Sequence, residues 1–147
     1  MEVLHPECDV RPWLAAHAGQ VSPYTAVRIR ASYETIPALL AGCPDRQGGS
    51  ACDVGCGAGF EAFALGMFFD RVDGIDSNPS AGAEARRIAR HAGISNVQFA
   101  RARLERWDAP ERFELVYCNL MSHNLPSRSA MMRRAAAMLE PRGVVLY

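Results

Sequence analysis

The stretch Asp53-Val54-Gly55-Cys56-Gly57-Ala58-Gly59 decides the fold of this chain. It begins inside a short apolar run, residues 51–54, which predicts a buried strand. Glycines at alternate positions allow the backbone to turn tightly and to approach a ligand closely, because no Cβ stands in the way. We expect a helix over 58–69 after the turn, and the free N–H groups at a helix start favour a negatively charged ligand group. The stretch therefore predicts a strand, a ligand-binding loop and a helix.

The rest of the chain from residue 50 onward alternates between short strands and helices. We expect strands over 51–54, 71–76, 97–100, 113–118 and 144–147, and helices over 58–69, 79–92 and 127–139. Such alternation predicts a parallel sheet with right-handed crossovers, whose ligands bind beyond the carboxyl ends of the strands. The sequence therefore predicts an α/β fold: a Rossmann-like, doubly wound, mainly parallel sheet in three α/β/α layers.

The first 48 residues are patterned more loosely. Apolar positions at helical spacing predict a helix over 24–40, which Pro37 could kink, and the Pro- and Gly-containing stretch 42–50 is typical of a connector. We predict two units: an N-terminal helical segment or cap, residues 1–48, and a cofactor-binding core, residues 49–147. Tyr24, Arg28 and Tyr33 on the predicted helix could cover a ligand in the core or serve only in packing.

Composition narrows the function classes. Apolar residues make up 49% and charged residues 22%, and the net charge is zero, so no broad positive surface is expected for nucleic acid. The longest apolar stretch, 62–69, is too short to cross a membrane, and charged residues break any signal peptide at the start. The five cysteines lack zinc-site spacing, so we predict no metal and a reduced, cytoplasmic setting. All sixteen basic residues are arginine, which is typical of a GC-rich bacterial genome.

A second candidate site residue is Asp76, at the end of the predicted strand 71–76 and seventeen positions after Gly59. A carboxylate at the tip of the second strand can accept both hydroxyls of a ribose. Ser77-Asn78-Pro79 is also a helix-capping sequence, so Asp76 could act only as a cap. Together with the glycine loop, the spacing favours a nucleoside-containing ligand.

The position after Gly59 separates two kinds of nucleoside cofactor. A dinucleotide loop, G-x-G-x-x-G, needs glycine at its sixth position, where this chain has Phe60. Over about residues 50–147 the sequence instead resembles the class I S-adenosylmethionine-dependent methyltransferase family, whose first motif is an apolar strand followed by D-x-G-x-G-x-G. The alternatives are an NAD(P)-binding Rossmann oxidoreductase and a catalytically silent cofactor-binding domain.

The resemblance implies roles for particular residues. The loop Gly55–Gly57 would pass along the methionyl part of the cofactor, with Asp53 near its amino group, and Asp76 would hold the ribose hydroxyls. Ser77 would lie against the adenine. The acidic residue that often contacts the adenine amine is missing from Ala102-Arg103-Leu104-Glu105 or displaced to Glu105. The resemblance therefore favours backbone groups of Arg103 and Leu104 as the adenine contacts. The cofactor-binding residues implied are Asp53, Gly55, Cys56, Gly57, Gly59, Asp76, Ser77, Arg103, Leu104 and Asn119.

The residues after the fourth predicted strand are the candidates for contact with the methyl acceptor. His123 could act as a general base there or could only line the pocket, since positioning supplies much of the rate of transfer from a sulfonium. The Asn/Asp-Pro-Pro-aromatic sequence typical of base or amide methylation is absent. We therefore expect a small-molecule acceptor, methylated on O, N or C in metabolite biosynthesis. Members of the family usually add two further strands, so we expect more residues downstream of Tyr147.

Overall fold

The computed structural model describes every residue of the chain except 44, 46 and 119–126. Its five strands form one sheet in the order β3-β2-β1-β4-β5, and every pair of neighbours is parallel. The strands are β1 (Ser50–Val54), β2 (Arg71–Asp76), β3 (Val97–Arg101), β4 (Phe113–Cys118) and β5 (Leu139–Leu146). The chain runs outward from β1 to β3 and then returns to the other side of β1. The switch point therefore lies between β1 and β4, as expected for a ligand site in such a sheet.

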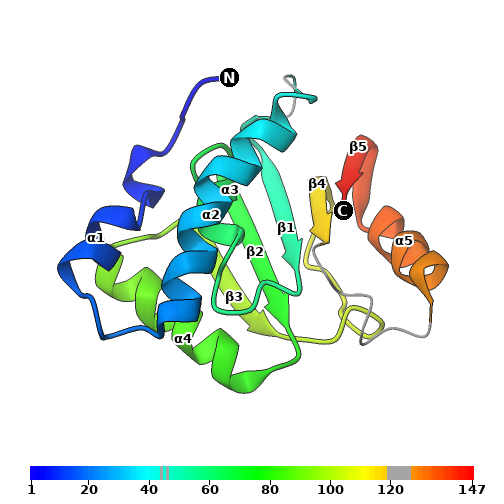
Figure 1. Ribbon diagram of the computed structural model, residues 1–147. Helices are drawn as coiled ribbons and strands as arrows, with labels where there is room; N and C mark the ends of the chain where they lie inside the picture. The colour runs from blue at the N-terminus through cyan, green and yellow to red at the C-terminus, as the bar shows by residue number, and fades with distance from the viewer. Residues whose placement is uncertain (44, 46, 119–126) are drawn as a thin grey trace.

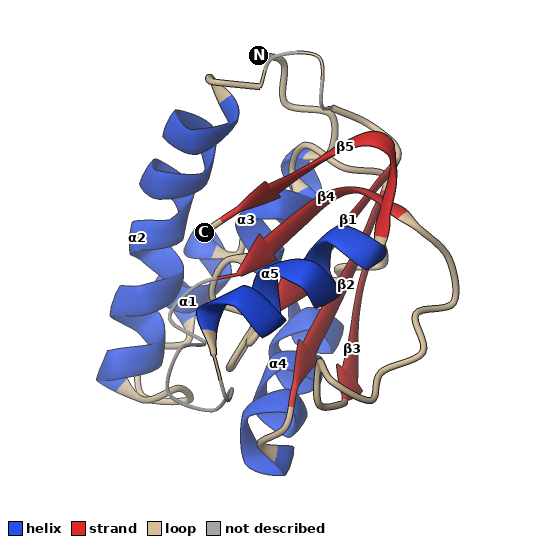
Figure 2. Ribbon diagram, turned by 90° about the vertical axis from the view of Figure 1, so that its right-hand side faces the viewer, coloured by secondary structure: helices blue, strands red, loops and turns tan. Residues whose placement is uncertain are grey.

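Helices cover both faces of the sheet. They are α1 (Arg11–Ala16), α2 (Pro23–Leu40), α3 (Ala62–Gly66), α4 (Pro79–Ala92) and α5 (Arg128–Ala137), preceded by a 3-10 turn, η1 (Pro6–Cys8). Helices α1 to α4 lie on one side of the sheet and α5 on the other (Figures 1 and 2). The predicted three-layer, doubly wound α/β fold is confirmed.

Alternation along the strands fills two separate cores. Side chains on one face of the sheet pack with α1 to α4, and among them are Ala51, Val72 and Leu115. The opposite face carries Cys52 and Val54, which belong to the core that includes residues of α5. Since successive residues of a strand point to opposite faces, both layers come from the same short apolar runs.

The predicted helix over 58–69 is wrong in extent, because α3 spans only Ala62–Gly66. Gly57 and Gly59 have φ angles of +54° and +85°, which an α-helix cannot include. The residues between Gly57 and the start of α3 therefore form turns. The fifth strand begins at Leu139 rather than 144, with an irregular register against β4. The strand nevertheless pairs in parallel, as predicted.

The N-terminal segment holds more structure than its sequence predicts, since η1 and α1 precede α2. Helix α2 continues through Pro37 and begins at the cap Ser22, whose side chain accepts a hydrogen bond from the Thr25 N–H. Tyr33 anchors this segment: its buried hydroxyl donates to the Cys8 carbonyl and accepts from the Val10 N–H at 3.0 Å. Tyr33 is therefore a packing residue. None of the helices in the described parts of the chain has the length and apolar character needed to span a membrane.

Candidate functional site

The glycine loop after β1 folds over the end of β2. The N–H groups of Gly55 and Cys56 donate to the Ile75 carbonyl at 2.8 and 3.1 Å. The N–H of Gly57 donates to Oδ2 of Asp76 at 2.9 Å. The two features that the sequence placed in one site, the loop and the carboxylate, are therefore in direct contact.

Two of the loop glycines are required by space as well as by backbone angle. A Cβ on Gly57 would lie 2.5 Å from the ring of Phe60, and a Cβ on Gly59 would lie 2.5 Å from the ring of Phe63. Both glycines also have positive φ, which strains a residue with a side chain. The loop is thus a narrow cradle whose exposed surface is mainly backbone, suited to close approach by a ligand.

Asp76 is held by the loop and by the turn that follows. Its Oδ1 accepts from the Asn78 N–H at 2.7 Å, while Oδ2 accepts from Gly57. The cap of α4 is Asn78, whose side chain accepts from the N–H groups of Ser80 and Ala81. The capping role that the sequence left open for Asp76 therefore belongs to Asn78.

Asp53 lies on the other side of the loop and is completely buried. Neither of its carboxyl oxygens makes a well-formed hydrogen bond within the described parts of the chain, although the Ala62 N–H is near enough to favour the charged form. Burial, and next the negative charge of Glu61, raise the pKa of Asp53 well above its ordinary value, against the opposing effects of the Ala62 N–H and Arg28. Asp53 is a carboxyl group in an environment that disfavours its charged form.

The buried Glu61 and the half-buried Arg28 complete this group of charged residues, and sequence reasoning missed their pairing. The Arg28 guanidinium, from α2, donates to Oε1 of Glu61 at 2.9 Å. The same guanidinium lies over the ring of Phe60, with its Cζ 5.2 Å from the ring centroid. This distance is within the limit of about 6 Å for a cation–π contact. One signal was available, since Glu61 is the single charged residue in the apolar run 58–69. Its partner, 33 positions away, was not recognisable from spacing.

Cys56 contributes backbone rather than chemistry to the loop. Its side chain is 1% exposed, and burial raises the pKa of its thiol. Tyr24, the remaining α2 residue singled out from sequence, is 65% exposed and packs edge-on against Phe60 with ring centroids 5.8 Å apart. Tyr24 thus stands at the surface next to the loop.

The residues predicted to contact adenine lie beside Asp76. The Ala102 N–H donates to the Asp76 carbonyl at 2.9 Å, which brings the next residues to the end of β2. Ser77 is half-buried, Arg103 is exposed and the Leu104 side chain is buried. The carbonyls of Arg103 and Leu104 already accept hydrogen bonds from the Arg106 N–H and from Nε of Arg134. Asn119 and His123 lie outside the described residues.

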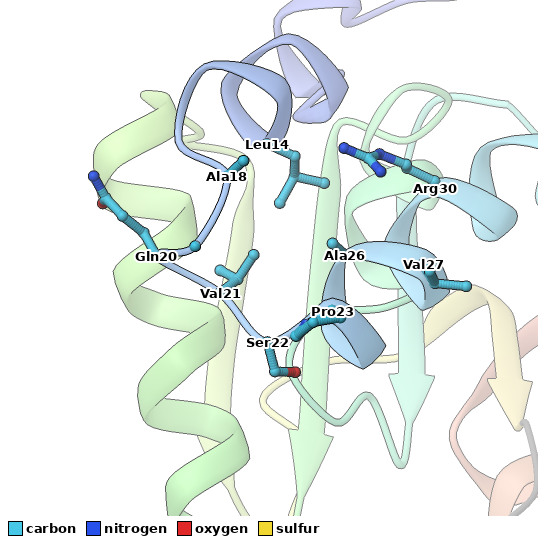
Figure 3. Close-up of a pocket in the computed structure, with 10 residues that line it drawn as sticks. Leu14, Ala18, Gln20, Val21, Ser22, Pro23, Ala26, Val27 and Arg30 are labelled. Carbon is cyan, nitrogen blue, oxygen red and sulfur yellow. The ribbon is translucent and has the colours of Figure 1, made fainter.

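A separate pocket opens at the start of α2 (Figure 3). Its volume is about 540 Å³, and the side chains of Leu14, Val21 and Ala26 point toward it. The lining residues are Leu14, Ala18, Gly19, Gln20, Val21, Ser22, Pro23, Ala26, Val27 and Arg30. Since none of the predicted site residues lines this pocket, it is distinct from the glycine-loop site.

Comparisons with known proteins place the chain among methyltransferase domains. Residues 51–143 match a family model described as a methyltransferase domain. A trans-aconitate 2-methyltransferase from Escherichia coli O157:H7 is 29% identical over 124 residues, which cover 83% of this chain and 46% of that protein. The chain thus spans about half the length of the curated relatives it matches.

Solved structures share the fold at low sequence identity. A methyltransferase from Thiobacillus denitrificans in complex with S-adenosyl-L-homocysteine is 20% identical, with a TM-score of 0.66 over 90% of this chain and 51% of its own. Coclaurine N-methyltransferase, bound to N-methylheliamine and S-adenosylhomocysteine, is 15% identical, with a TM-score of 0.69 over 78% of this chain and 34% of its own.

Proposed function

This chain belongs to the family of methyltransferase domains, and on that premise we propose that it binds S-adenosylmethionine and transfers its methyl group to a small molecule. The observation that carries the proposal is the contact between the Gly57 N–H and the Asp76 carboxylate, 2.9 Å long, which joins the glycine loop to the acid at the end of β2. The narrow cradle at Gly57 and Gly59 and the unpartnered Asp53 fit the backbone and the ammonium of the methionyl part.

The residues of the chain bind and orient the cofactor in this proposal. Asp53 faces the α-ammonium, the loop Gly55–Gly59 lies along the methionyl chain, and Asp76 accepts from the ribose hydroxyls. Adenine contacts Ser77 and backbone groups of Arg103 and Leu104, and Asn119 lies on the cofactor side of the acceptor. When bound, the cofactor would supply a methyl group activated by its attachment to a positively charged sulfur. The protein contributes mainly alignment of this methyl group with the acceptor.

Binding experiments separate this function from its alternatives. Calorimetry of the chain with S-adenosylhomocysteine and with NAD should give binding of the first and none of the second. The reverse result favours a nicotinamide-dependent oxidoreductase and overturns the proposal. Binding without methyl transfer from labelled cofactor to any small-molecule acceptor favours a catalytically silent domain.

The finer parts of the proposal rest on sequence. The absence of a net charge favours a small metabolite over nucleic acid as the acceptor, in a bacterial cytoplasm, and the boundary at residue 48 separates cap from core. If His123 is the general base, His123→Ala should lower kcat by about a hundredfold and remove a pH dependence near 6.5. If His123 only lines the pocket, the same change should raise KM for the acceptor and leave kcat nearly unchanged.

A further inference from the structure

The charges around Asp53 are unbalanced among the described residues. Three carboxyl groups interact there, those of Asp53, Glu61 and Asp76, and the cation among them is Arg28. The guanidinium of Arg28 is already bonded to Glu61. Asp53 is fully buried and makes no well-formed hydrogen bond among the described residues, so an ionised Asp53 would carry a cost of desolvation that the Ala62 N–H and Arg28 offset only in part.

The other titratable neighbours of Asp53 in the part of the chain that the structure describes are thiols and a phenol, which carry no positive charge. Tyr117 is its register partner on β4, and Cys56 lies in the loop. Burial raises the pKa of both groups, and also that of Cys52 beside Asp53 on β1, so these side chains stay neutral. Within the described residues, Arg28 is therefore the cation that acts on Asp53, and a further positive charge can come from a ligand.

We propose that Asp53 holds a proton in the ligand-free protein and that the α-ammonium of the cofactor replaces this proton, so that the site selects ligands with a cationic amino-acid end. This inference rests on the proposed function and adds a specificity element to it. An ammonium brings both the missing charge and three N–H donors for the unpartnered oxygens. A ligand that lacks the amino-acid end leaves Asp53 protonated.

Proton balance follows from the two titrating groups. Below the ordinary pKa of an α-amino group, about 8, the ligand arrives as an ammonium and the proton of Asp53 goes to solvent. Each binding event then releases about one proton, as long as Asp53 of the free protein is protonated at that pH. Above that pH the ligand arrives as a neutral amine and takes the proton from Asp53, so net release disappears.

Glu61 acts here as a positioning residue. Its charge favours the protonated form of Asp53, and its ion pair holds Arg28 over Phe60. Replacing Glu61 by glutamine removes the charge and keeps the size of the side chain. In this variant proton release should persist at low pH and decline at a lower pH than in the parent, a shift that a purely structural role for Glu61 would not produce.

Calorimetry in two buffers tests the proposal. The chain is titrated with S-adenosylhomocysteine at about pH 6 in buffers of different ionisation enthalpy, which reports the protons exchanged. We expect release of about one proton for the parent and none for Asp53→Asn, which should bind more weakly. The matched ligand, 5′-methylthioadenosine, keeps the adenosine end without the amino acid and should bind without release. Binding of S-adenosylhomocysteine with no proton exchange, or undiminished release from Asp53→Asn, overturns the inference.

A second measurement works without a ligand. Carboxyl carbon chemical shifts of the free protein, with the Asp53 signal assigned by its loss in Asp53→Asn, should show Asp53 protonated at pH 6. An ionised Asp53 at this pH overturns the inference whatever the ligand does. Failure of both adenosine ligands to bind overturns the proposed function instead, and the chemical shift still decides the state of Asp53.

Discussion

Asp53 and Asp76 flank the same glycine loop, and the fold treats their carboxyl groups in opposite ways. Asp76 accepts two backbone hydrogen bonds, from Gly57 at 2.9 Å and from Asn78 at 2.7 Å, and is partly exposed. Asp53 is fully buried and accepts none from the described residues. One acid is oriented before a ligand arrives, whereas the other lacks a partner that a ligand can supply. The protein itself thus supplies hydrogen-bond donors to the carboxylate of Asp76, whereas the carboxyl group of Asp53 can receive donors from a ligand.

The largest expected effect on ligand affinity comes from distorting the glycine loop between Asp53 and Asp76. Gly57→Val places a Cβ 2.5 Å from the Phe60 ring at a φ of +54°, so either the ring or the loop backbone that contacts Asp76 must shift. We expect affinity for S-adenosylhomocysteine to fall by about a thousandfold or more, on the order of 4 kcal/mol, as measured by calorimetry.

The matched control for this prediction is Gly93→Val. Gly93 ends α4 with a similar φ of +75°, and a Cβ there would meet nothing within 4 Å. This variant should lose about 1–2 kcal/mol of stability from backbone strain and keep its affinity. If Gly57→Val binds within tenfold of the parent, the loop does not contact the ligand.

The next effect isolates the oriented acid. Asp76→Ala removes two charge-assisted hydrogen bonds to ribose, worth about 2–4 kcal/mol, so affinity should fall by roughly 30- to several hundredfold. Asn78→Ala is the control, because it removes the cap of α4 but not the Asp76 carboxylate. It should cost about 1 kcal/mol of stability and change affinity less than threefold. An Asp76→Ala protein that binds within threefold of the parent would exclude a ribose contact.

The fold was largely predictable because its signals are local. Runs such as 51–54 and 113–118 are apolar, short and bounded by loops, which is enough to place strands and to infer parallel order from the intervening helices. The helix over 58–69 failed for a physical reason: an apolar run does not distinguish a buried helix from buried turns, and the positive φ of Gly57 and Gly59 decides between them.

The site residues were predictable only where one continuous stretch of the sequence contains the motif. Asp53, Asp76 and the glycines follow from position within the strand–loop–helix pattern, and the structure brings the loop and Asp76 together. The Arg28–Glu61 pair joins residues 33 positions apart through the packing of α2 on α3, and no periodicity encodes that contact. Burial of Asp53 without a hydrogen-bond partner among the described residues is likewise a property of the assembled core.

The smallest expected effect is on the pH dependence of stability, which tests whether burial keeps Asp53 protonated. In the unfolded chain the carboxyl of Asp53 titrates near 3.9, and in the folded protein burial raises its pKa. Between these two values the folded state binds a proton that the unfolded state has lost. The free energy of unfolding therefore decreases as pH rises through this interval, by at most about 1.4 kcal/mol per pH unit.

Asp53→Asn removes this titration. The free energy of unfolding of the variant should therefore increase relative to that of the parent as pH rises above about 4, until the pH exceeds the folded-state pKa of Asp53. Urea denaturation of the ligand-free proteins between about pH 4 and 8 measures the difference. Asp70→Asn provides a control of opposite sign, because the hydrogen bond to His5 and the Gly49 N–H lower the pKa of Asp70. Asp70 stabilises the folded state above the unfolded pKa and loses this contribution as pH falls, so its removal should cost stability at neutral pH and little in acid. A pH-independent difference between Asp53→Asn and the parent would mean that Asp53 is ionised in the folded protein despite its burial, and that the two acids of the loop differ in orientation alone.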